Sequence, residues 1–238
     1  MFGAKPLSVL VYCESPPNGD YPLPSFDSRF CPFHPFNKKI KKGWEVWEKN
    51  HHKFHLENYA LIKCKNFVDN NFSAVVLINK KAVLQTIDTN LNDFKSILGE
   101  HVTAKWLLEE ILNSKDVFGG VLKNHQGLIG TLLGYGRNNA WTFQLREEAQ
   151  QAKKDPIRIV HSAAAQKRWQ ALNKRLKLFT HGQRFNSLFM NLPGFVADLD
   201  SVETQILKRK YEQDYQNILH RYKEGEFLEI TLRQLISK

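Results

Sequence analysis

The chain of 238 residues is long enough to bury one large core or two small ones, and its 42% hydrophobic and 12% aromatic residues exclude a wholly disordered protein. It carries no apolar run of about 18 residues, so we expect no membrane-spanning helix. The apolar stretch of residues 7–11 is too short for a signal peptide, and three cysteines are too few for a disulfide framework. We therefore expect a cytoplasmic protein, with secretion left open.

The N-terminal residues 1–37 are predicted to form an extended arm rich in proline and aromatic residues, with one short strand. Residues 6–13 have the length and apolar character of that strand. Residues 15–37 contain six prolines, which exclude a regular helix, and five aromatic residues, which predict that the arm docks on the body of the protein. Residues 38–238 show no polar linker and no internal repeat, and are expected to form a single helical domain.

Helical spacing dominates the rest of the chain. Apolar residues three and four apart indicate a helix over residues 80–98, which Gly99 ends, and Thr103 is placed to cap the next helix. Asp200 and Glu203 have the spacing of a capping box that starts a long C-terminal helix. Further helices are expected over residues 38–60, over residues 126–153 with a break at Gly134 or Gly136, and over residues 163–179.

Strands are expected to be few. Residues 72–78 are apolar and β-branched, which fits a strand or the lead-in to a helix. Residues 157–160 alternate weakly between apolar and polar side chains and are a candidate strand that pairs with residues 7–12. Residues 227–236 fit either a short helix or a strand. The expected fold class is therefore mainly α, an α-helical bundle with a minor two- or three-stranded β element, with α+β as the alternative.

A glycine-rich segment over residues 127–139 is the first candidate site. Glycines let a backbone approach a phosphate, and the start of a helix offers free N–H donors. The segment lacks the spacing of a dinucleotide fingerprint or a P-loop, and its glycines fit equally well a close helix contact with a kink at Gly136. The candidate ligand-binding residues are Gly134, Tyr135, Gly136, Arg137, Asn138 and Asn139.

Clustered positive charge is the second candidate site. Residues 146–184 hold ten bases and three acids, and residues 38–42 add four lysines. The expected helix over residues 163–179 places Trp169, Leu172, Leu176 and Phe179 on one apolar arc. Its basic residues fit either the solvent-exposed face of a helix that packs on the core, or a surface that binds phosphates or anionic lipid. The candidate polyanion-binding residues are Lys167, Arg168, Lys174, Arg175, Lys177 and Arg184.

Other chemistry has weaker support in the sequence. His51 and His55 share a helical face, but with Cys31 and His34 they match no usual zinc spacing, and we expect no metal site. Ser162 follows His161 without a Gly-x-Ser-x-Gly elbow, so catalytic residues and cofactors stay unassigned and enzymatic activity is left open.

The function that these features favour is non-catalytic. We expect a binding or interaction protein whose basic face meets a polyanionic partner such as nucleic acid, an anionic lipid surface or a phosphorylated ligand. One alternative is a small-ligand-binding protein or enzyme with its site at residues 127–139. Another is a secreted interaction protein or effector.

Overall fold

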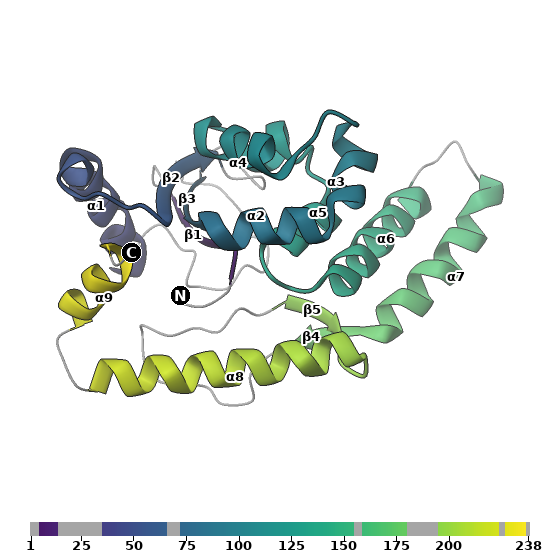
Figure 1. Cartoon of the computed structure of the whole chain (residues 1–238). Coiled ribbons are helices and arrows are strands. Elements are labelled where there is room, and N and C mark those ends of the chain that lie inside the picture. Colours follow the sequence, from purple (N-terminus) through teal and green to yellow (C-terminus); the bar gives the residue numbers. More distant parts are fainter. Residues whose placement is uncertain are drawn as a thin grey trace. The chain divides into compact units, whose positions relative to one another are not determined.

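The computed structural model describes residues 5–13, 35–65, 72–154, 159–179, 195–223 and 227–236. The fold is mainly helical with a minor antiparallel β element, as the sequence predicts. Two compact units make up the chain: a first unit of residues 3–124 with 227–238, and a second unit of residues 125–226 (Figure 1). The predicted division into an arm and a single helical domain stays a prediction, and residues 14–34 of that arm lie outside the described residues.

The sheet of the first unit consists of β1 (Leu7–Cys13), β2 (Tyr59–Lys65) and β3 (Phe72–Asn79). The strand order is β1-β3-β2, and both contacts are antiparallel. The central strand β3 is apolar on both faces: Ala74, Val75, Val76 and Ile78 are all buried. A strand that is buried on both faces needs a neighbour along each edge, and β1 and β2 supply them.

Two expectations about this sheet need correction. Residues 7–13 pair with β3; of residues 157–160, the candidate partner strand, 159 and 160 begin a helix, and 157 and 158 lie outside the described residues. The helix expected over residues 38–60 ends at Asn50, and its C-terminal part contributes to β2 instead. The short apolar pattern of residues 59 and 60 does not decide between helix and strand, and pairing with β3 places them in β2.

Side-chain caps and one glycine mark three helix ends in the first unit, and Asn90 divides the expected helix of residues 80–98 in two. Asn79 accepts a hydrogen bond from the Ala82 N–H (3.1 Å), and Thr103 caps its helix as predicted, accepting from the Trp106 N–H (3.2 Å). Gly99 ends a helix with a φ of +118°. The helices and turns of this unit are α1 (Pro35–Asn50), η2 (His51–Lys53), α2 (Lys80–Thr89), α3 (Leu91–Leu98), α4 (Ala104–Asn113), η3 (Val117–Val121) and α9 (Phe227–Ile236).

The second unit consists of four helices and a two-stranded antiparallel sheet in its described residues. Its elements are α5 (Gln126–Leu132), α6 (Arg137–Lys154), α7 (Ile159–Arg175), β4 (Leu176–Phe179), β5 (Phe195–Asp198) and α8 (Val202–Lys223). Helix α6 packs against both α5 and α7, and β4 pairs antiparallel with β5 (Figure 1). Among the described residues no helix is both long and apolar enough to cross a bilayer.

The helix expected over residues 163–179 is too long, because Leu176–Phe179 form β4. Leu176 is buried whereas Lys177 and Leu178 are exposed, and Leu178 lies opposite Val196 of β5. The proposed apolar arc therefore ends at Leu172. Leu176 and Leu178 are two residues apart, a spacing that fits a strand as well as the end of a helix, and pairing with β5 places them in a strand.

Phe94 of α3 tests where the stability of the first unit lies. Its side chain is fully buried, so Phe94→Ala is expected to lower the free energy of unfolding of this unit by about 3–5 kcal/mol. Val46→Ala, at a side chain that is 54% exposed, should change it by less than about 0.5 kcal/mol. Urea unfolding followed by hydrogen exchange measures both; equal shifts would contradict this account of the core.

Candidate functional site

The glycine-rich segment forms the turn between α5 and α6, so the predicted break in the long helix is confirmed at both glycines. Gly134 has a φ of +76° and Gly136 a φ of +89°, a region that favours glycine. A Cβ on Gly136 would lie 2.7 Å from the carboxyl carbon of Glu203. Gly136 is therefore required both by its backbone conformation and by the close approach of α8.

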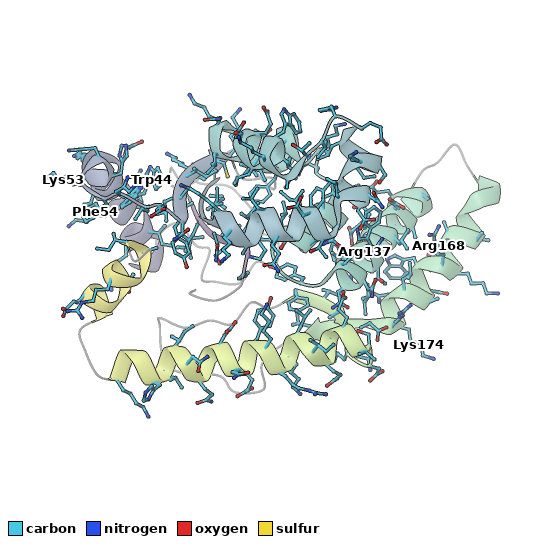
Figure 2. All side chains as sticks on the ribbon, in the orientation of Figure 1. Trp44, Lys53, Phe54, Arg137, Arg168 and Lys174 are labelled. Carbon is cyan, nitrogen blue, oxygen red and sulfur yellow. The ribbon has the colours of Figure 1, made fainter. Side chains whose placement is uncertain are left out.

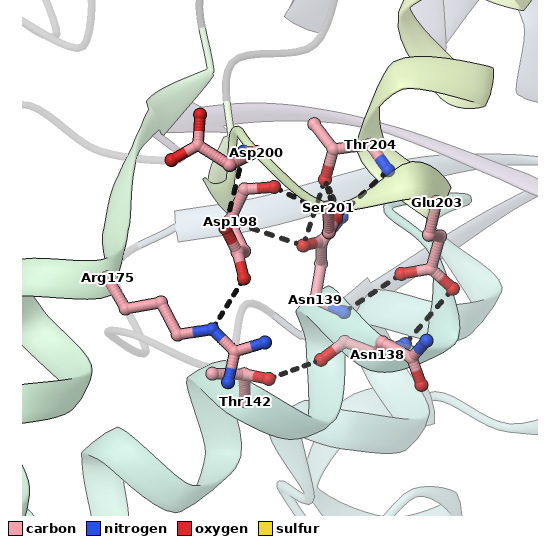
Figure 3. A network of polar contacts seen from close by, with 9 residues as sticks. All are labelled: Asn138, Asn139, Thr142, Arg175, Asp198, Asp200, Ser201, Glu203 and Thr204. Carbon is pink, nitrogen blue, oxygen red and sulfur yellow. Dashed lines mark hydrogen bonds and ion pairs between the residues drawn. The ribbon is translucent and has the colours of Figure 1, made fainter.

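The start of α6 already binds a carboxylate of the same chain. Glu203 of α8 accepts the N–H of Asn138 at Oε1 and the N–H of Asn139 at Oε2, each at 3.1 Å (Figure 3). Free N–H groups at a helix start carry partial positive charge and attract anions. The anion-binding geometry that the sequence indicates is thus present, and an internal side chain occupies it.

Helix α8 begins differently from the predicted capping box. The N–H of Thr204 donates to the Ser201 hydroxyl (3.2 Å), so Ser201 caps the helix in place of Asp200. Glu203 is then released from the local role that a capping box would give it, and it reaches α6 instead. The local spacing is right for a cap, but a partner far away in the sequence takes the carboxylate.

Asn139 connects three elements through one buried amide. Its Nδ2 donates to the Tyr135 carbonyl (3.0 Å). Figure 3 shows its contacts with Thr204 and Asp198: Nδ2 also donates to the Thr204 hydroxyl (2.9 Å), and Oδ1 accepts from the Asp198 N–H (3.1 Å). Asn139 and Thr204 are each only 1% exposed. Both donors of the amide are used inside the protein, which identifies Asn139 as a structural residue of this turn.

Stacked rings close the same joint. Tyr135 stacks on Phe195 of β5 with centroids 4.5 Å apart and an interplanar angle of 8°. Tyr211 of α8 packs edge-on against Phe195, and its hydroxyl donates to the Gly134 carbonyl (2.5 Å). Burial raises the pKa of both tyrosines, so each hydroxyl stays protonated near neutral pH. We call this network of the α5–α6 turn, β5 and the start of α8 the Glu203 joint.

Five of the six predicted ligand residues make the contacts of the Glu203 joint described above; Arg137, the sixth, is exposed and donates from Nη1 to Asn138 Oδ1 (3.5 Å). Its exposed guanidinium carbon lies 5.8 Å from the centroid of the Trp141 ring. The ligand-binding role of residues 134–139 stays a prediction, and their contacts favour the structural interpretation that the sequence left open. Sequence reasoning missed Asp198, Thr204 and the role of Glu203, because nothing local marks a contact about sixty residues away.

The predicted basic residues lie on two elements of the second unit. Lys167, Arg168 and Lys174 are exposed on α7, and Lys177 is exposed on β4. Figure 2 labels Arg168 and Lys174 on α7. Arg175 differs, because its Nε donates to the Asp198 carboxylate, which neutralises part of its charge. Arg184 lies outside the described residues.

Metal and thiol chemistry have little support in the described part of the chain. No group of three or more His, Cys, Asp and Glu side chains is placed there to hold a metal ion. The Cys64 thiol is 3% exposed, and burial together with the nearby Asp116 charge raises its pKa to about 11. Such a thiol is a poor nucleophile at neutral pH. No family model, curated protein or solved structure matches this chain.

Replacing Gly136 by alanine tests the joint against a matched exchange. Gly136→Ala is expected to destabilise the second unit by about 2 kcal/mol or more, because the residue has a positive φ and its new Cβ would meet Glu203. Gly43→Ala, inside α1 with no atom within 4 Å of the added carbon, should stabilise its helix by about 1 kcal/mol.

Hydrogen exchange of peptides from each unit measures the two changes separately. An unchanged or stabilised Gly136→Ala protein would contradict the assignment of a structural role to this turn.

Proposed function

We propose that this protein is a non-catalytic binding protein that contacts a polyanionic partner through α7 and β4. The contact residues would be Lys167, Arg168, Lys174 and Lys177, which we call the α7 face. The observation that supports this most is the composition of α7: it carries four bases and no acid over its 17 residues. A solvated helix usually mixes both signs of charge, whereas a phosphate-binding helix gains from one sign only.

The arrangement of the α7 face suits a phosphate backbone. Residues seven apart on a helix are almost in line, so Lys167 and Lys174 form one row about 10 Å long, with Arg168 and Arg175 in a second row. The exposed Ala164 and Ala171 lie between the rows on the helical wheel. Small side chains between two rows of bases leave room for a backbone to approach, which supports binding of an extended chain of phosphates.

A small-ligand site at residues 134–139 has less support, because the N–H groups that would bind an anion already donate to Glu203. Nucleic acid is the first partner to test, and it is consistent with the expected cytoplasmic location. Anionic lipid and a phosphorylated ligand share the same chemistry and are separated by the choice of probe.

The test is a fluorescence-anisotropy titration with a short duplex across a salt series, beside vesicles that contain phosphatidylserine. We expect micromolar binding whose logarithm falls with the logarithm of salt at a slope of about −3, since each neutralised phosphate contributes about −0.9. Lys167→Glu with Lys174→Glu should weaken duplex binding at least about tenfold and flatten the slope by about 2.

The matched control is Lys81→Glu with Lys105→Glu, which changes the net charge equally at two exposed lysines of the first unit. Both positions lie in the first turn of a helix, where a carboxylate is tolerated. An equal loss of duplex affinity in both variants would show that binding depends on net charge and not on the α7 face. Binding that neither variant alters would contradict the proposal, and binding to vesicles alone would assign the α7 face to lipid.

A further inference from the structure

A second cationic surface lies on the first unit, along α1 and η2. Lysines and one valine recur there at steps of three and four residues, and all of their side chains are exposed. Steps of three and four alternate along one face of a helix, so these side chains form a line about 21 Å long. This lysine stripe consists of Lys39, Lys42, Val46, Lys49 and Lys53.

The opposite face of α1 turns towards the protein. Ile40, Trp44 and Trp47 are half-buried, and α1 packs against β1. The acids Glu45 and Glu48 are exposed but lie to one side of the lysine stripe on the helical wheel. The stripe therefore faces solvent as a line of four lysines, and Glu45, three residues from Lys42 and four from Lys49, flanks it on one side.

An aromatic pair stands at the C-terminal end of the lysine stripe. Phe54 stacks on Trp47 with ring centroids 5.9 Å apart and an interplanar angle of 22°. The centroid of the His51 ring lies 6.3 Å from that of Trp47. The Phe54 ring is still 36% exposed. Figure 2 shows Phe54 and Lys53 together at the outer end of α1. A ring that is supported by a second ring and remains open to solvent is a platform for stacking.

We propose that the lysine stripe and Phe54 together bind single-stranded nucleic acid. The lysines would follow the phosphates, and an unpaired base would stack on Phe54. Surfaces for single strands combine these two features, a cationic track and an exposed aromatic ring, and extend over a few nucleotides. A duplex fits less well, because its bases are already stacked on one another and cannot reach the ring.

An anionic membrane is the main competitor for such a helix, and the contacts of α1 disfavour it. A helix that lies in a membrane surface buries its apolar face in the lipid. In this protein that face packs on β1, and the outward stripe offers the bilayer a single apolar residue, Val46. The lysine stripe goes beyond the α7 face and uses none of its residues.

The experiment uses the full chain with Lys167→Glu and Lys174→Glu already in place, so that the α7 face cannot mask the result. The probes are an oligo(dT) of about 12 nucleotides and an abasic strand of equal length. Phe54→Ala should weaken oligo(dT) binding about tenfold and leave binding of the abasic strand unchanged, because only bases can stack. Phe54→Trp should restore the affinity, and Ile206→Ala, at an exposed apolar side chain of α8 that belongs to neither proposed surface, is the matched control.

The lysines are tested separately with Lys42→Glu and Lys49→Glu. This pair should weaken both probes and flatten the salt slope by about 1.4, since each contact with a single strand contributes about −0.7. Circular dichroism checks that each variant is folded. If Phe54→Ala does not fold, the comparison of the two probes is made with Phe54→Trp, whose ring can still stack on a base. Equal losses for both strands in Phe54→Ala would overturn the stacking role. Binding to phosphatidylserine vesicles, lost in the lysine variant while oligo(dT) binding persists, would assign the stripe to a membrane.

Failure here is distinguishable from failure of the α7 proposal, because the two sets of variants share no residue. Loss of duplex binding in the Lys167 and Lys174 variant supports the α7 face whatever happens at Phe54. Base-dependent loss at Phe54 supports the lysine stripe whatever happens on α7.

Discussion

The second unit depends on one carboxylate. Glu203 satisfies two N–H groups at the start of α6 and, with the Asn139 amide, ties α8 and β5 to that helix. A buried polar group without a partner costs about 1–3 kcal/mol, so this network constrains several neighbours at once. Position 136 must be glycine for the carboxylate to approach, and the tyrosines that pack beside it must stay neutral. The same contact occupies the two N–H groups at the start of α6 that an anion would bind.

Exposed positive charge lies on two other helices, α7 and α1, and both carry it on the side that faces solvent. Helix α7 packs on α6 and α1 packs on β1, and in each case the half-buried side holds the tryptophans while the exposed side holds the bases. Exposed charges act over a Debye length of about 8 Å at physiological salt, so each surface works through contacts close to it. The surfaces differ at their ends: the α7 face continues into β4, and the lysine stripe ends at a stacked aromatic pair.

Much of the fold could be predicted from the sequence because the contacts that define these elements are between residues close together in the chain. Thr103, Gly99 and the apolar spacing of residues 80–98 act through neighbours three or four positions away, and each was read correctly, although Asn90 divides that stretch into α2 and α3. The strand character of residues 6–13 was also predicted correctly. Two errors fall where a helical and a strand period compete: residues 59 and 60 and residues 176–179 were expected in helices, and their short apolar patterns also fit the strands that they form with partners elsewhere in the chain.

By itself the sequence determined the helical fold class, the cap at Thr103 and the stop at Gly99, the break at the glycines and the two concentrations of positive charge, since these depend on composition and on short-range geometry. Only the tertiary structure decided what Glu203 binds, that Arg175 pairs with Asp198, and that Phe54 stacks on Trp47 with a third of its ring open. Hydrogen bonds and ring contacts require atoms within a few ångströms. No spacing along a chain fixes that distance for residues that are dozens of positions apart.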